Sequence, residues 1–187
     1  MWRRMIFFAC LLAAIKANAQ TRPVLISHAD STRAIAFDSV TRQREPFTTT
    51  TPIRFGSDPA SRVMLFAMNL QLQPGETAAV VTADAEDANH NTYQLTVEHV
   101  APLADYPWVS SVIIRLPPSL PATGDVLVRL TYRAIASNRV RVGIGQVGGG
   151  PPDDIGASPT PGTLLPLEPP SFAATTNLTS TDVQTIL

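Results

Sequence analysis

The residues best suited to chemistry form an acidic group around one predicted turn. They are Asp84, Glu86, Asp87 and Asn89. Carboxylate and amide oxygens close together are the ligands that Ca²⁺ prefers. However, Asp84 and Glu86 share one face of a predicted strand while Asp87 points elsewhere, and the D-x-D-x-D-G spacing of a calcium loop does not occur. We therefore predict a solvated polar hairpin without a metal, and keep calcium binding as the alternative.

A second candidate is the aromatic pair Tyr106 and Trp108, which flank Pro107 between two predicted strands. On an exposed loop these rings could stack on a sugar or contact a protein partner. At the start of a strand, the simpler interpretation is a tryptophan that fills the core, as in many β-sandwiches. We favour the core interpretation and keep ligand binding by Tyr106 and Trp108 as the alternative.

Motifs for catalysis do not occur in the sequence. His28, His90 and His99 are too scattered for an H-x-H or H-x-x-x-H zinc site. There is no G-x-S-x-G nucleophile elbow, and the glycines at 148–150 do not lie between a strand and a helix, as a phosphate-binding loop requires. The only cysteine, Cys10, precedes the predicted mature chain, which therefore has no thiol. We predict a protein that is not an enzyme and holds no cofactor.

The first twenty residues have the layout of a secretory signal peptide. A basic start at residues 1–4 is followed by an apolar run at 5–15, and Ala17 and Ala19 frame a cleavage site. The apolar run is about half of the ~20 residues that a membrane-spanning helix needs. We predict cleavage near Ala19, a secreted, periplasmic or cell-surface location, and no membrane span in the mature chain.

The charge of the chain argues against a nucleic-acid partner. The sequence has 14 Lys and Arg residues against 15 Asp and Glu residues, and the basic residues of the predicted mature chain form no cluster. Binding to phosphates requires clustered positive charge. A protein or glycan partner is therefore the prediction that remains.

The elements that must position these residues are β-strands, because apolar and polar residues alternate with a period of two. Seven strands are predicted, within residues 34–40, 62–70, 80–84, 93–98, 111–116, 126–133 and 139–144. The run at 62–70 is apolar on both faces, so we place it centrally. Because no helix-period segment separates the strands, we predict an all-β fold, an immunoglobulin-like β-sandwich of about seven strands.

Composition divides the chain into successive parts. They are a signal peptide at 1–19, a short polar lead at 20–32, the sandwich at 33–146, a Pro/Gly-rich linker at 147–176, and the start of a helix at 177–187. An isolated helix this short is not stable in water. We therefore interpret the last residues as the start of a following, truncated domain, with a frayed C-terminus as the alternative.

Two parts of the sequence resemble known families. Residues 115–121, 124–128 and 137–138, with 38–41 and 44–47, resemble Ig/IPT-like modules of large exported proteins from acidobacteria and related soil bacteria. This resemblance covers about residues 33–144, and it implies a β-sandwich and export but no catalytic residues. Residues 177–187 are similar to the opening helix of the haem-binding GlcG/HbpS-like family, whose domains often begin Leu-Thr-x-x-Asp-Val.

Together these patterns predict an exported, non-catalytic β-sandwich module. It would act as a spacer or interaction domain of a larger extracellular or cell-envelope protein. One alternative is the accessory N-terminal part of a haem-binding GlcG/HbpS-like protein. Another is a calcium- or carbohydrate-binding module.

Overall fold

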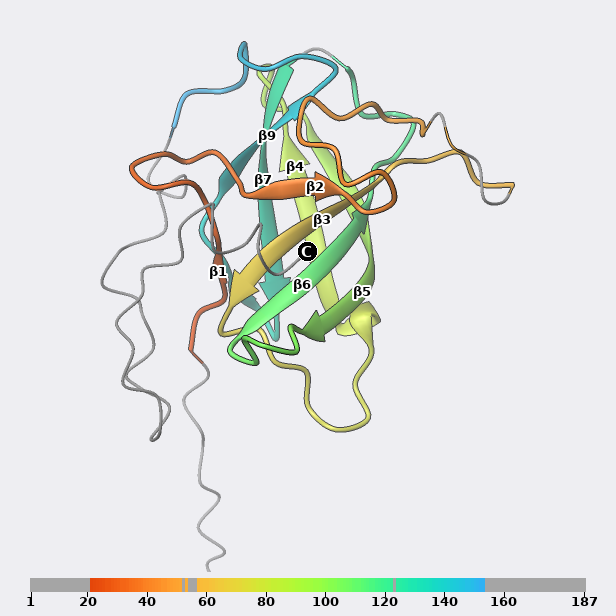
Figure 1. Ribbon diagram of the computed structural model, residues 1–187. Helices are drawn as coiled ribbons and strands as arrows, with labels where there is room; N and C mark the ends of the chain where they lie inside the picture. The colour runs from red at the N-terminus through yellow and green to blue at the C-terminus, as the bar shows by residue number, and fades with distance from the viewer. Residues whose placement is uncertain (1–20, 52, 54–56, 123, 154–187) are drawn as a thin grey trace, which may run out of the picture.

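The computed structural model describes residues 21–51, 53, 57–122 and 124–153 (Figure 1). In this part of the chain the regular elements are β-strands and a single turn of 3₁₀ helix, η1 (Ala78–Val80). The strands are β1 (Val24–Leu25), β2 (Ala36–Asp38), β3 (Arg62–Met68), β4 (Val81–Glu86), β5 (Thr92–Pro102), β6 (Val109–Arg115), β7 (Gly124–Tyr132), β8 (Ile135–Ala136) and β9 (Val140–Ile144). The all-β prediction is confirmed.

The strands form one curled antiparallel sheet, and the prediction of a two-sheet sandwich is wrong. The order is β1-β3-β6-β5-β4-β7-β8, with β2 also paired to β3 and β9 also paired to β7. The two halves share β5, whose first residues pair with β4 and whose later residues pair with β6. The register shifts between Val97 and His99. A bulge of this kind bends a strand and increases its twist, so β5 turns the corner that a sandwich would leave as a loop.

The far ends of the curled sheet are also tied together. Isolated parallel bridges join Arg33 to Arg141 and Phe47 to Ile144, on the edge of β9 that does not face β7. The Ala34 N–H donates to the carbonyl of Arg141 at 2.9 Å. Residues before and after β2 therefore cover the edge of β9, which leaves this strand protected against pairing with another chain.

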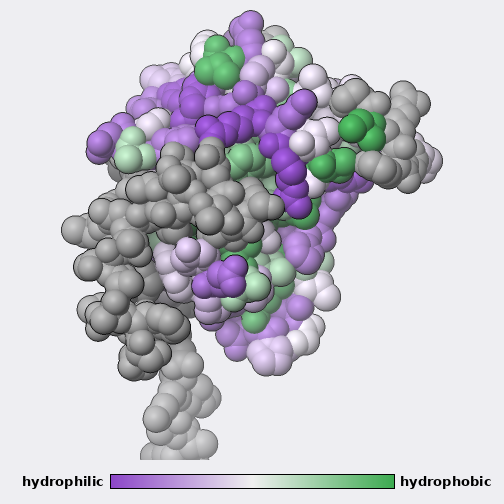
Figure 2. Space-filling model, in the orientation of Figure 1, coloured by the Kyte–Doolittle hydropathy of each residue, from purple (hydrophilic) through white to green (hydrophobic). Residues whose placement is uncertain are grey.

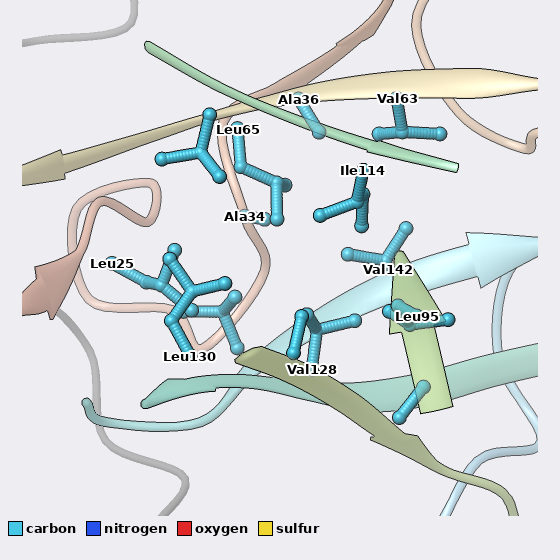
Figure 3. Packing of buried hydrophobic residues seen from close by; sticks show 14 of the residues in the cluster. Leu25, Ala34, Ala36, Val63, Leu65, Leu95, Ile114, Val128, Leu130 and Val142 are labelled. Atoms are coloured by element: carbon cyan, nitrogen blue, oxygen red, sulfur yellow. The ribbon is translucent and has the colours of Figure 1, made fainter. Parts of the chain in front are cut away.

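The main hydrophobic core fills the inside of the curl. Figure 3 shows Leu65 from β3 and Ile114 from β6 facing Val128 from β7 and Val142 from β9. These four side chains are at most 1% exposed. Burial of an aliphatic side chain of this size contributes about 1.5–3 kcal/mol, so the inward residues of both halves hold the sheet in its curled form.

All seven predicted strands are present, and the central position of residues 62–70 is confirmed because β3 has strands on both sides. The structure adds β1 within the predicted polar lead. Val24 and Leu25 are 3% and 1% exposed, and the buried Asn138 side chain accepts from the Leu25 N–H and donates to its carbonyl. The folded part therefore begins before Arg33. The sequence did not indicate this strand, because two buried residues are too few to show a period.

Two polar anchors hold the points where the chain enters and leaves the described domain. Near β1, the Arg22 guanidinium donates to the carbonyls of Ala136 and Ser137 at 3.0 and 2.9 Å. After β9, the Arg141 guanidinium binds Asp153 at 2.5 Å. Figure 1 shows these two points at well-separated places along one side of the molecule.

Several predictions concern residues outside the described part of the chain. They are the signal peptide at 1–19, most of the predicted linker at 147–176, and the helix at 177–187. The first residues of that linker, up to Asp153, pack on the domain, since the Gly148 carbonyl accepts from the Asp125 N–H. Among the described residues, no helix combines the length and the apolar character needed to cross a membrane.

Candidate functional site

The acidic residues predicted around the β4–β5 turn bind other protein groups. Asp84 faces its register partner Arg129 across β4 and β7, with an ion pair of 3.1 Å. Glu86 binds Arg139 at 2.5 Å and His90 at 2.6 Å. These contacts draw the Asp84 and Glu86 carboxylates toward different cations, rather than toward one shared point.

Asp87 stabilises the predicted hairpin loop from within. Its carboxylate is buried and accepts hydrogen bonds from the Asn89 and Asn91 N–H groups, the Asn91 amide and the Tyr93 hydroxyl. Burial by itself raises the pKa of Asp87, but these donors outweigh that effect and hold the pKa below its usual value. His90 adopts the left-handed φ of 62° that the turn requires. Asp87 therefore has a structural role in the loop, to which Asn89 contributes its backbone N–H.

No group of three or more His, Cys, Asp or Glu side chains in the described ranges is arranged to hold a metal ion. This agrees with the separate partners of the acidic residues. The other candidate residues, Tyr106 and Trp108, lie at a second hydrophobic cluster.

Tyr106 and Trp108 lie together at the margin of a second hydrophobic cluster. Their rings meet edge to face, with centroids 6.2 Å apart. Both side chains are half-buried, and they pack against a cluster distinct from the main core. The structure thus brings the two predicted residues together, outside the core that we favoured for them.

The second cluster occupies the outward side of β1, β2, β3 and β6. We call this surface the outer apolar face, and its buried members are Val24, Ile26, Ile35, Phe37, Met64, Phe66, Met68 and Val109. Register places these residues in rows across the strands, such as Phe37, Met64 and Ile113. The Phe37 and Phe66 rings also meet edge to face at 6.2 Å.

This composition is unusual for the outward side of an antiparallel sheet, which normally carries polar residues. The eight buried members are 0–8% exposed. All described strands belong to the single curled sheet, so in this part of the chain neither a second sheet nor an α-helix packs over them. Figure 2 views the molecule from the side where β3 and β6 lie in front, and only small, separate areas of hydrophobic surface are visible there.

Arginines border one end of the outer apolar face. The Arg44 guanidinium lies 5.8 Å from the centre of the Phe37 ring, a cation–π arrangement. The Arg42 guanidinium contacts the Met64 sulfur at 3.7 Å. Both arginines are exposed, and neither forms an ion pair with a carboxylate of the described residues. The face therefore combines an apolar centre with positive charge at its rim.

A polar hollow of about 320 Å³ lies beside this rim, lined by Asp38, Arg44, Phe47 and several threonines. Asp38 accepts hydrogen bonds from the N–H groups of Val40 and Thr41 at 2.9 and 2.7 Å. Its carboxylate thus closes a local turn. The lining is typical of a solvated groove between loops. Its residues do not form the pair of acid and base that a catalytic site would need.

Sequence reasoning found only part of the outer apolar face. The signal for β3 was present, because residues 62–70 are apolar on both sides. We interpreted that run as a central strand. A strand that is apolar on both sides also implies that both of its faces are buried, and we did not draw this second conclusion. Val24 and Ile26 lay in the predicted polar lead and gave no periodic signal.

Comparison with protein-family models, with curated proteins and with solved structures gave no match. Function therefore has to be inferred from the geometry of the described domain and from the sequence.

Proposed function

We propose that this chain is an exported, non-catalytic β-domain that acts as a spacer or interaction domain of a larger extracellular or cell-envelope protein. The leader-like residues 1–19 and the lack of catalytic motifs in the sequence support this proposal. The observation that carries it is that the chain is anchored where it enters the domain and where it leaves it.

The two anchors support the spacer role in a specific way. Arg22 holds the incoming chain to the turn after β8. Arg141 holds the outgoing chain through Asp153 and the Pro151 carbonyl, and the Thr32 hydroxyl also binds Asp153. A domain that fixes both ends of its chain sets the distance and direction between the segments on its two sides.

The spacer role can be tested by measuring the distance between the two anchored ends. The mature chain has no cysteine if cleavage follows Ala19, so Thr21→Cys and Pro152→Cys create unique sites for spin labels. Pulsed electron paramagnetic resonance on residues 20–187 should give one narrow distance distribution. The matched control is Thr82→Cys with Thr96→Cys, on the exposed sides of β4 and β5, which measures the width due to the labels alone.

A distribution much broader than that of the control pair would contradict the spacer role. Export is tested separately, by expressing the full chain in a secreting bacterial host and sequencing the N-terminus of the product. A product that begins at Gln20 outside the cytoplasm supports export. A product that stays in the cytoplasm with residues 1–19 intact contradicts it.

A further inference from the structure

A second hollow, of about 240 Å³, adjoins the polar hollow described above. We call it the His28 hollow. Its lining combines apolar side chains with His28, Arg44 and Glu45. Arg44 lines the polar hollow as well, so the two hollows meet at this residue. Together they reach the volume of roughly 300–1,000 Å³ that is typical of small-molecule sites.

Two basic groups of the His28 hollow have no partner in the described part of the chain. Arg44 forms no ion pair there, and the His28 ring forms no hydrogen bond. The Glu45 carboxylate, in contrast, is fully engaged. One of its oxygens accepts from the Arg33 guanidinium at 2.9 Å, and the other accepts from the Gly143 N–H at 2.7 Å. The hollow therefore has an unpaired positive charge, and its negative charge is already bound.

The titration of His28 indicates a positive field inside the hollow. The pKa of its imidazole lies below the usual value of 6.5. Burial is the largest cause, because it disfavours the charged form of the ring. Of the nearby charges, Arg44 lowers the pKa more than Glu45 raises it, and Arg33 lowers it further. An anion in the hollow would meet this positive field, and it would raise the pKa of His28.

The polar hollow offers hydrogen bonds to neutral groups instead. Asp38 uses one carboxylate oxygen for the N–H groups of Val40 and Thr41, and its other oxygen has no hydrogen bond within the described ranges. The side chains of Gln43 and Thr50, which also line this hollow, have no hydrogen-bond partner there either. The Asp38 carboxylate accepts hydrogen bonds from hydroxyl groups but repels a second anion. This hollow therefore suits a hydroxylated group rather than an acidic one.

We propose that the two hollows bind a sugar acid of the hexuronate type, with its carboxylate at Arg44 and His28 and its hydroxyl groups in the polar hollow. The guanidinium group matches a carboxylate in charge and geometry, and a neutral imidazole can donate one further hydrogen bond. Neutral sugars lack the charged group, and simple carboxylic acids lack the hydroxyl groups. This inference goes beyond the proposed spacer role.

The proposal can be tested by an NMR titration of residues 20–187 with sodium glucuronate. Glucuronate should shift the resonances of both hollows until they saturate, and it should raise the pKa of the His28 ring. Neutral glucose and acetate, titrated at the same ionic strength, are the controls. Each should bind at least about tenfold more weakly, because each lacks part of the polar contacts of the sugar acid.

Variants of neighbouring residues locate the binding. Arg44→Gln should weaken glucuronate binding about tenfold, and the exposed position of this side chain should leave the fold intact. Arg42→Gln is the matched control, because Arg42 is also exposed but lines neither hollow. Gln43→Ala should weaken the binding of glucuronate and leave the binding of acetate unchanged.

A parallel titration with an oligoglucuronide distinguishes a free sugar acid from a polysaccharide, and saturable binding of either form supports the proposal. No saturable shift with either form overturns it. Wild-type binding of glucose or acetate that equals the binding of glucuronate also overturns it, as do equal losses for Arg44→Gln and Arg42→Gln. The distance between positions 21 and 152 does not depend on this ligand, so the proposed spacer role and the proposed sugar-acid site fail separately.

Discussion

The outward surface of β4, β7 and β9 and the outward surface of β3 and β6 belong to one sheet but have opposite character. On the first, Asp84 and Arg129 form a cross-strand ion pair, and Glu86 binds Arg139. On the second, Met64 and Phe66 occupy the equivalent outward positions. The inward sides of both halves are apolar and share one core. The difference shows that the outward side of the first half carries ion pairs, while the outward side of the second half carries a second buried hydrophobic cluster.

The largest effect should come from the centre of the outer apolar face. Phe66→Ala should lower the free energy of unfolding by about 3–5 kcal/mol, as for a ring in a closed core. Urea unfolding followed by fluorescence measures this loss, with Thr96→Ala on the polar side of β5 as the control. A loss below about 1 kcal/mol would show that Phe66 has little packing around it and would remove the contrast with the polar half.

An intermediate effect is expected in the hairpin of the polar half. Asp87→Ala removes the acceptor of four hydrogen bonds and leaves donors of the loop without a partner. We expect a loss of about 1–3 kcal/mol by the same unfolding measurement. Asp87→Asn keeps one acceptor oxygen and should lose less. Equal losses for both variants would mean that the charge, and not the hydrogen bonding, stabilises the loop.

The two halves should also differ in their response to acid. Hydrogen bonds from Tyr132 and Arg133 lower the pKa of Glu76 to about 2, from an unperturbed value of 4.5. A lowered pKa in the folded state stabilises the fold above pH 4.5, and this contribution is lost as the pH falls toward 2. Glu76→Gln should therefore lower the thermal midpoint at pH 7, and its curve should meet the wild-type curve near pH 2.

Met68→Ala provides the matching control on the outer apolar face, because no titratable group is removed. Its thermal midpoint should lie below that of the wild type by a similar amount at every pH between 2 and 7. A Glu76→Gln curve that runs parallel to the wild-type curve would instead contradict the proposed link between Glu76 and acid sensitivity.

The smallest effect is expected for the exposed ion pair on the polar half. Arg129 is 42% exposed and Asp84 is 17% exposed, so Asp84→Asn should cost about 0.2–1 kcal/mol. The loss should shrink in high salt, because mobile ions screen the pair. A thermal shift with calcium that disappears in this variant would revive the calcium alternative for Asp84.

The strands could be predicted because a half-buried strand leaves alternation in the sequence. The curl could not, since it depends on the bulge in β5. A trace of that bulge exists: buried Leu95 and Val97 are two residues apart, but the next inward residue, Val100, follows after three. Such a change of phase at one position is too weak to distinguish a corner strand from a strand that ends.

The outer apolar face was less predictable than the strands. Tyr106 and Trp108 were found by their residue types, but the cluster on which they pack is assembled from β1, β2, β3 and β6. Val24 and Met68 are neighbours because their strands pair across 44 positions of sequence. A local sequence pattern cannot indicate a contact over this separation. The anchors of Arg22 and Asp153 have the same origin in long-range contacts.

The two anchors have a mechanical consequence. Tension applied between residues 21 and 153 loads the Arg141–Asp153 contact and the two-residue strand β1 before it reaches the long pairings of β3, β6 and β7. We expect the outer contacts to break first, so that the segment at 147–153 lengthens while the sheet stays closed. Under tension, the domain would first extend by a short length at its end and would then resist further extension.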